Sequence, residues 1–351
     1  MHGVDTGRRP FVLVWELTQA CALSCDHCRA EAQPDRHPDE LTTAEGKRLL
    51  DNARAFGEGQ LVVFSGGDPA KRDDLLELIE YGTEIGLTVT LTPSGTEALS
   101  AEMVRRLADS GLKRMALSLD GASADTHDDF RGESGSFDQT LAAARAARDA
   151  ELPLQINTTV CQRTVDDLPE LRTLVSGLDA ALWSVFFLVP VGRGRVLEPI
   201  DPARADEVMD WLAGVEDESQ FAVKTTEAPQ YRRIRAQREG SDPDRSGIIA
   251  GDGFAFVSHT GEVYPSGFLP ESAGNVREES VVSLYRDSPL FESLRDRDQL
   301  QGKCGACPYR AICGGSRSRA YAYTGDPLAS DPLCPYVPPD YEGSAPTREL
   351  P

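Results

Sequence analysis

Residues 21–28 read CALSCDHC, and this stretch decides how the rest of the chain is interpreted. Its cysteines Cys21, Cys25 and Cys28 have the spacing C-x3-C-x2-C. Three such thiolates can hold three irons of a cubane cluster and leave the fourth iron free to bind a small molecule. Structural zinc sites and ferredoxin clusters have four ligands instead, although this spacing alone also fits zinc or unrelated thiols. We expect His27 to pack over the cluster, because its neighbour Cys28 already points inward.

The cysteines follow an apolar run at residues 11–15, which predicts a buried strand. Further predicted strands alternate with predicted helices, which cover residues 41–56, 73–86, 100–110, 137–150 and 165–176. The strands are expected at residues 60–64, 88–91, 115–119, 154–160 and 183–189. This alternation gives six βα repeats and predicts a parallel sheet. Six repeats rather than eight indicate an open barrel.

Five segments are expected along the chain. They are a flexible N-terminus (1–9), a partial barrel (10–200), a helical connector (201–245), a cysteine-rich domain (246–337) and a flexible tail (338–351). Within the cysteine-rich domain, residues 251–264 alternate like a hairpin with its turn at Thr260-Gly261.

The cysteine loop after a first strand resembles that of the radical S-adenosylmethionine enzymes. The resemblance implies an α/β fold, with a partial (βα)6 TIM-like barrel and a small C-terminal SPASM or twitch domain. It also implies that the open iron of a [4Fe–4S] cluster binds the amino and carboxylate groups of S-adenosylmethionine. Reductive cleavage of that molecule then gives a 5′-deoxyadenosyl radical, so that Cys21, Cys25 and Cys28 are the expected catalytic ligands.

The resemblance also assigns cofactor-binding residues to the carboxyl ends of the strands, where parallel barrels bind ligands. Residues 65–69, SGGDP, resemble the family's GGEP motif, which receives the methionine amino group. Alone, this motif would indicate only a tight turn. The expected cofactor-binding residues are Ser65, Gly66, Gly67, Asp68, Ser94, Ser118, Arg131, Asn157 and Gly192. A capping or surface role is the alternative for each single residue.

A second cysteine group has the spacing C-x2-C-x5-C-x20-C and comprises Cys304, Cys307, Cys313 and Cys334. Four thiolates can close a zinc ribbon. The pattern also resembles the SPASM domain, in which such cysteines hold an auxiliary [4Fe–4S] cluster. Ser266 and Ser316 stand where that domain often has further cysteines, so we expect one auxiliary cluster. Cys161 has no partner in the sequence and is expected to be a buried apolar residue.

Two strings resemble one branch of the family: residues 25–30 and residues 313–334 (CGGSRSRAYAYTGDPLASDPLC). This branch comprises heme d1 biosynthesis proteins and alternative, siroheme-dependent heme synthases. It implies oxidative decarboxylation of the propionates of an iron-porphyrin, iron-coproporphyrin III, with the auxiliary cluster as an electron acceptor. An electron donor such as ferredoxin or flavodoxin would be a further partner. Arginine forks suit the substrate's carboxylates, and the candidates are Arg193, Arg195, Arg232, Arg233, Arg317 and Arg319.

Two alternatives remain. A SPASM-type peptide maturase would usually carry an N-terminal leader-binding domain, and only about ten residues precede the first predicted strand. A non-catalytic iron–sulfur or zinc protein would not need the C-x3-C-x2-C motif.

Composition narrows the surroundings in which the protein works. The formal net charge of −21 disfavours nucleic acid as a partner. No apolar stretch approaches the roughly 20 residues that span a bilayer, and the start lacks a secretory signal, so we expect no membrane partner and a cytoplasmic location. Eight cysteines in such a chain point to metal sites rather than disulfides.

The acidic residues are spread along the chain, and lysine is scarce, which is typical of halophilic proteins. An ordinary acidic protein is the alternative. If the surface is adapted to salt, the thermal unfolding midpoint should rise as potassium chloride is increased into the molar range. A maximum of stability in dilute buffer, with loss of folding at high salt, would exclude the halophilic interpretation.

Overall fold

The computed structural model describes residues 5–240, 247–339 and 341–343. The first strand, β1 (Val12–Glu16), comes from the apolar run before the cysteines. It starts a series of parallel strands, each joined to the next by helices: β2 (Leu61–Ser65), β3 (Thr88–Leu91), β4 (Met115–Ser118), β5 (Leu154–Val160), β6 (Leu182–Phe187) and β7 (Ala222–Thr226). The helices are α1 (Thr43–Arg54), α2 (Leu75–Glu84), α3 (Ala101–Asp109), α4 (Ala124–Arg131), α5 (Ser136–Asp149), α6 (Leu168–Gly177), α7 (Pro202–Glu218) and α8 (Gln230–Glu239).

The C-terminal part extends the same sheet on the other side of β1. Strand β9 (Gly253–Val257) pairs parallel with β1 and antiparallel with β10 (Glu262–Tyr264), so the expected hairpin is confirmed. The remaining elements are β8 (Ile249–Ala250), β11 (Gly274–Asn275), α9 (Val281–Asp287), α10 (Pro289–Arg295), α11 (Gly302–Ala306) and α12 (Arg317–Thr324). That β9 joins the barrel sheet directly was not expected.

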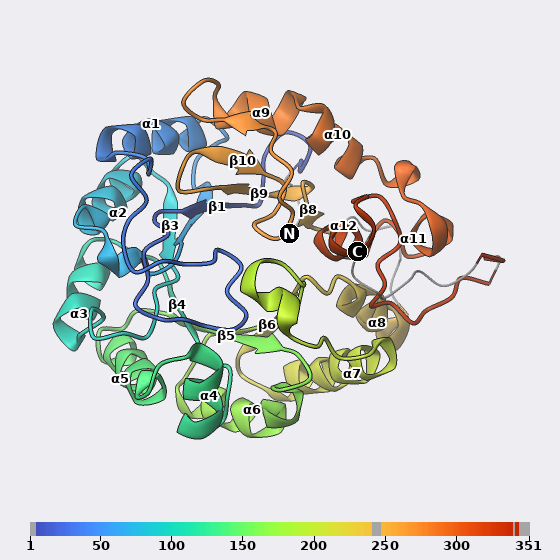
Figure 1. Ribbon diagram of the computed structural model, residues 1–351, viewed down its shortest axis with the longest axis horizontal. Helices are drawn as coiled ribbons and strands as arrows, with labels where there is room; N and C mark the ends of the chain where they lie inside the picture. Colours follow the sequence, from blue (N-terminus) through green and yellow to red (C-terminus); the bar gives the residue numbers. More distant parts are fainter. Residues whose placement is uncertain (1–4, 241–246, 340, 344–351) are drawn as a thin grey trace.

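The whole sheet has the order β11-β10-β9-β1-β2-β3-β4-β5-β6-β7 and ends at β7 on one side and at β11 on the other. Helices ring its outer face, and the chain between β1 and α1 crosses the middle of the ring (Figure 1). The predicted partial barrel is therefore confirmed as an open α/β barrel. No helix in the described part of the chain combines the length and apolar character that crossing a membrane requires.

Two elements of the βα series were missed by the sequence analysis. Strand β7 lies within residues 201–245, which were expected to be helical, and it pairs parallel with β6 as a seventh strand. It is short, and Val223 is its one fully buried side chain, so it carries no apolar run. Helix α4 is also short and polar, and it is defined by a capping box at Ser123 and a left-handed Gly132. The boundaries of the expected domains stay a prediction.

The expectations for residues 1–4, 241–246, 340 and 344–351 lie outside the described residues. Within the expected flexible N-terminus, Arg9 is held by the barrel. It donates hydrogen bonds to the Gln60 side chain (2.9 Å) and to the carbonyl oxygen of Glu58 (3.0 Å).

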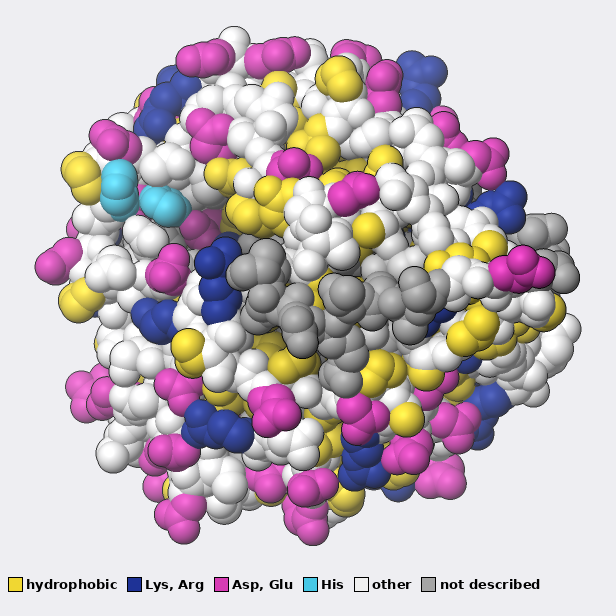
Figure 2. Space-filling view, turned by 45° about the vertical axis from the view of Figure 1, so that its right-hand side comes forward, with side chains coloured by type: hydrophobic (Ala, Val, Ile, Leu, Met, Phe, Trp, Pro, Cys, Tyr) yellow, Lys and Arg dark blue, Asp and Glu magenta, His cyan; other side chains and the backbone are white. Residues whose placement is uncertain are grey.

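The basic run in α8 is explained by its neighbour α7. Arg233, Arg235 and Arg238 pair with Asp206 (2.6 Å), Asp217 (2.6 Å) and Asp210 (2.9 Å). On the face shown in Figure 2, acidic side chains are scattered rather than gathered in one patch.

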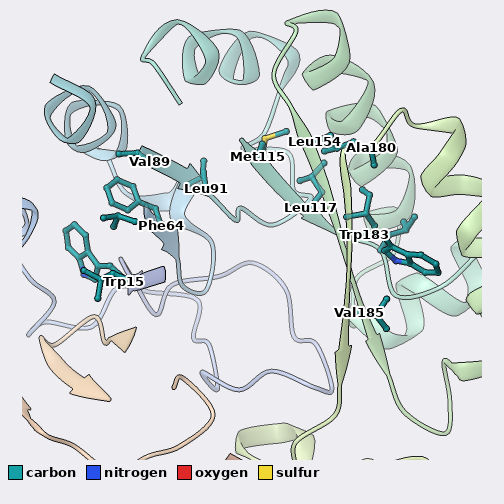
Figure 3. Close-up of a cluster of buried hydrophobic side chains, with 14 of the residues drawn as sticks. Trp15, Phe64, Val89, Leu91, Met115, Leu117, Leu154, Ala180, Trp183 and Val185 are labelled. Carbon is teal, nitrogen blue, oxygen red and sulfur yellow. The ribbon is translucent and has the colours of Figure 1, made fainter. Parts of the chain in front are cut away.

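The core lies between the sheet and the surrounding helices. Trp15, Phe64, Leu117 and Trp183 are fully buried members of one continuous apolar cluster (Figure 3). The rings of Trp15 and Phe64 meet edge to face with their centroids 5.5 Å apart. Helix α1 packs on Trp15 at Gly46, and it is capped by Thr42, whose side chain forms a capping box with Glu45.

Gly46 of α1 tests this packing, because a Cβ there would lie 2.4 Å from the Cη2 atom of Trp15. We expect Gly46→Ala to lower the free energy of unfolding by about 1–3 kcal/mol, since the buried ring has no room to move. Gly214→Ala is the matched control inside α7, where a Cβ would meet nothing within 4 Å. It should raise stability by up to about 1 kcal/mol. Anaerobic thermal unfolding measures both, and equal midpoints for the two variants would contradict the account of this contact.

Candidate functional site

The first cysteine group lies in the loop after β1. Cys21 and Cys25 are buried, Cys28 is partly buried, and the three lie in one small cluster with Leu23 and Ala32. Each sulfur receives an N–H group: Leu23 N lies 3.3 Å from Cys21 Sγ and Ala32 N 3.4 Å from Cys28 Sγ, and Arg131 Nη1 lies 3.6 Å from Cys25 Sγ. Burial raises the pKa of the Cys21 and Cys25 thiols. Metal coordination would deprotonate them outright, and the N–H groups suit the resulting thiolates.

Close backbone contacts fix this loop. Gly67 N donates to Thr18 O (2.8 Å), and a Cβ on Gly67 would lie 2.4 Å from Ala20 O. Gly192, with a φ of +54°, approaches from beyond β6, and its Cβ would lie 2.6 Å from Cys28 O. A side chain at either glycine would push the loop away, so the turns after β2 and β6 both require glycine here.

A cavity adjoins the loop and brings together six of the predicted cofactor-binding residues: Ser65, Gly66, Gly67, Ser94, Ser118 and Arg131. Ser94 connects the cavity to the cysteines, since its Oγ lies 3.6 Å from Cys21 Sγ and 3.2 Å from Gly67 O. Leu23, Thr92, Pro93, Gly95, Ser136 and Thr140 complete the lining and were not predicted. Leu23 lies within the cysteine motif, the residues at 92, 93 and 95 follow β3, and Ser136 and Thr140 belong to α5.

Arg131 is the charged residue of this cavity. Its Nη2 lies 2.7 Å from Asp120 Oδ2, and its buried Nε has no hydrogen-bond partner among the described residues. An unsatisfied guanidinium N–H at a cavity wall fits a carboxylate ligand. His27 stacks on Phe130 with ring centroids 4.6 Å apart, and burial lowers its pKa to about 4, so the imidazole is neutral at pH 7.

Three predicted residues do not line the cavity. The Asp68 carboxylate is fully buried and accepts from Ala70 N (3.1 Å), Ser94 N (3.3 Å) and Thr96 Oγ1 (2.9 Å), so it orders the turn after β3. Asn157 stands beside Ser118 in the sheet and accepts from Gln155 Nε2 (2.7 Å). Gly192 contacts the cysteine loop instead.

The second cysteine group surrounds its own hollow. Cys304, Cys307, Cys313 and Cys334 all line it, together with Gly314 and Gly315, whose φ values are +70° and +69°. Burial raises the pKa of Cys313 to about 12. Four unbridged thiols around one hollow fit a metal cluster that would deprotonate them.

All eight cysteines are described, and none forms a disulfide. Within the described residues, no three His, Cys, Asp or Glu side chains converge on a position for one metal ion. A cubane cluster binds each thiolate through a different iron atom and therefore spaces its ligands more widely than one ion does. Cys161 is fully buried in an apolar group with Phe130, Leu188 and Leu197, as expected.

The two serines at expected cysteine positions both contact Glu227, which follows β7. Ser266 Oγ (3.0 Å) and Ser316 Oγ donate to its carboxylate, and so does Ser318 Oγ (3.0 Å). Glu227 adopts a φ of +54°, which is unusual for a residue with a side chain. These hydroxyls are thus engaged in a hydrogen-bonded group that ties β7 to the cysteine-rich part.

Most of the six arginines proposed for substrate carboxylates have other partners. Arg193 donates to Cys25 O and Ala32 O, Arg232 to Ile312 O and Ile248 O, and Arg233 pairs with Asp206. Buried Arg317 donates to Pro327 O and Ala329 O, and buried Arg319 pairs with Asp331 and donates to Phe187 O. Arg195 is exposed and has no ion pair with a described residue.

Comparisons with known proteins agree with this arrangement. The family model of the radical SAM superfamily matches residues 15–175. An AdoMet-dependent heme synthase of Methanosarcina barkeri is 40% identical over 94% of this chain and 97% of that protein. A pre-heme d1 synthase of Dinoroseobacter shibae is 30% identical over 92% of this chain and 85% of that protein.

Among solved structures, Streptococcus suis SuiB bound to S-adenosylmethionine has a TM-score of 0.77, with 19% identity over 94% of this chain and 78% of that chain. At that identity the likeness shows the fold alone. The heme synthase relative, which is matched over nearly its whole length, shows the family. With three free thiols beside a cavity at the carboxyl ends of the strands, the chain belongs to the radical SAM superfamily.

Proposed function

We propose that this radical SAM enzyme decarboxylates propionate side chains of an iron-tetrapyrrole and converts iron-coproporphyrin III to heme. The observation that carries the proposal is the 40% identity to a heme synthase across nearly all of both chains. The first cysteine group of this chain borders one cavity, and the second surrounds another.

The residues around the first cavity would bind the cofactors. Cys21, Cys25 and Cys28 would hold a [4Fe–4S] cluster, which together with bound S-adenosylmethionine supplies a 5′-deoxyadenosyl radical on one-electron reduction. Arg131 would direct its free Nε toward the methionine carboxylate, while Ser65, Gly66 and Gly67 offer backbone groups for the methionine amino group. Ser94 and Ser118 would lie along the rest of the ligand, and Asn157, which stands beside Ser118 in the sheet, would contact a ligand that extends beyond the cavity. Asp68 and Gly192 would hold the turns in position.

The proposed reaction breaks two bonds in each propionate. A hydrogen atom leaves the carbon next to the ring and forms 5′-deoxyadenosine. The bond to the carboxylate then breaks and releases carbon dioxide and one electron, which leaves a vinyl group. The electron requires a one-electron acceptor, and the site of Cys304, Cys307, Cys313 and Cys334 would provide one when it holds an auxiliary [4Fe–4S] cluster.

The engaged serines support a single auxiliary cluster. Ser266 and Ser316 are hydrogen-bonded to Glu227 and are poor iron ligands in any case. We propose ferredoxin or flavodoxin as the electron donor. We also propose a cytoplasmic location, because iron–sulfur sites suit a reducing compartment. The dispersed acidic residues and the scarcity of lysine support a halophilic source.

A peptide maturase remains the second candidate. A structure of SuiB bound to the precursor peptide SuiA shares this fold, with 18% identity over 94% of this chain. The higher identity to heme synthases favours the tetrapyrrole.

Cysteine variants should separate the two sites. With Cys21→Ala, we expect no 5′-deoxyadenosine, because the cluster beside the cavity is lost. With Cys304→Ala, about half of the iron and the ability to form 5′-deoxyadenosine should remain, while vinyl formation stops. Iron analysis and chromatography of the nucleoside measure these outcomes, with Cys161→Ala as the control that keeps all iron. If the Cys304 variant kept all of its iron but formed no 5′-deoxyadenosine, the assignment of Cys304 to a second, auxiliary cluster would be contradicted.

The substrate is tested by anaerobic incubation with dithionite, S-adenosylmethionine and iron-coproporphyrin III. We expect two successive mass losses of carbon dioxide plus hydrogen, ending at heme, with 5′-deoxyadenosine formed alongside. Formation of 5′-deoxyadenosine with unchanged porphyrin would leave the family membership intact but refute the proposed substrate.

A further inference from the structure

A row of polar residues crosses the inner face of the open barrel. The strand register places Ser118 beside Asn157, Asn157 beside Ser184, and Ser184 beside Lys224, on the neighbouring strands β4, β5, β6 and β7. Residues paired in this way point to the same face of a parallel sheet.

That face is the interior of the barrel. The residues one position earlier, Leu117, Ile156, Trp183 and Val223, belong to the apolar core beneath the helices, where Figure 3 labels Leu117 and Trp183. Because side chains alternate along a strand, the polar row points the other way, into the space that the sheet encloses.

The row begins at Ser118, in the wall of the cavity described above, and ends at the cation Lys224. Ser118 lines the cavity with Arg131. Lys224 lies three strands away, a separation of about 14 Å at the usual strand spacing. A ligand that reached from one end to the other would therefore extend across four neighbouring strands of the open barrel.

Lys224 lies near other cations rather than near a carboxylate. Its side chain is accessible, yet protein surrounds it closely enough that burial lowers its pKa, with Arg114 and Arg232 contributing. Among the described residues, no ion pair joins Lys224 or Arg114 to an acidic side chain. Arg232 is occupied by carbonyl oxygens, which leaves Lys224 and Arg114 as the available charges.

Arg114 belongs to the same interior face. It precedes β4 by one residue and alternates in phase with Ala116 and Ser118, and its Nη1 lies 3.5 Å from Gln155 Oε1. Gln155 in turn donates to Asn157 of the polar row (2.7 Å). Like charges near one another repel, and an anion held between Lys224 and Arg114 would relieve that repulsion.

We propose that Lys224 and Arg114 form an anion-binding site inside the barrel, which takes a carboxylate of the substrate distant from the reacting one. This inference rests on the proposed function, because an iron-coproporphyrin carries several propionates around one rigid ring. A carboxylate fixed at Lys224 would determine which propionate lies beside the cavity at Ser118 and Arg131. Lys224 and Arg114 are thereby positioning residues for a ligand with separated carboxylates.

The test compares Lys224→Gln and Arg114→Gln with Lys113→Gln, which removes the charge of an exposed lysine next to Arg114 in sequence. The probes are iron-coproporphyrin III and its tetramethyl ester, which lacks the negative charges. Dissociation constants are measured by absorbance titration of the anaerobic protein, with circular dichroism as the check on folding. We expect Lys224→Gln to raise the dissociation constant for the acid about tenfold and to leave that for the ester unchanged. Lys113→Gln should match the wild type with both probes.

Wild-type affinity for the acid in both the Lys224 and the Arg114 variant would overturn the anion site while leaving the proposed function standing. If these variants lost affinity equally for the acid and the ester, the anion site would also be overturned, because the substitutions would then have altered the shape of the binding site rather than its charge. If the wild type neither binds nor converts iron-coproporphyrin III, the proposed function fails, and the anion site fails with it.

Discussion

The site depends on how closely the turns after β2 and β6 can approach the cysteine loop. That loop contains no helix or strand of its own between β1 and α1, so contacts from outside add to its own hydrogen bonds in setting its shape. Gly67 and Gly192 reach the carbonyl oxygens of Ala20 and Cys28 at distances that exclude any side chain. The same contacts align the three thiols with the cavity, so one steric constraint fixes both the cysteines and the ligand pocket beside them.

Buried arginines provide the second structural constraint. Arg319 joins Asp331 to the carbonyl groups at the end of β6, and Arg232 joins α8 to the carbonyl groups around Cys313. A guanidinium group can satisfy several acceptors in fixed directions, which suits the junction between barrel and cysteine-rich part. The arginines that look available for substrate in the sequence are thus mainly structural, while Lys224 and Arg114 remain without acidic partners.

The sequence predicted the features that strong local patterns encode. The βα alternation led to the open barrel, and the family resemblance carried by the cysteine spacing and the SGGDP turn led to six residues of the cavity. Strand β7 was missed because it is short and only Val223 of it is fully buried. Ser136, Thr140 and the unpaired charge of Lys224 could not be found, because strand register and loop packing bring them into place from distant positions. The role of Asp68 was also hidden, since its partners Ser94 and Thr96 belong to the next βα unit.

We infer that Cys21, Cys25 and Cys28 hold a cluster with one iron open to a ligand in the adjoining cavity. Low-temperature electron paramagnetic resonance of the dithionite-reduced Cys304→Ala/Cys307→Ala variant examines that cluster without the second one. We expect added S-adenosylmethionine to shift the g-values of the reduced cluster, because the ligand would bind the open iron. A spectrum that is unchanged by saturating S-adenosylmethionine would contradict it.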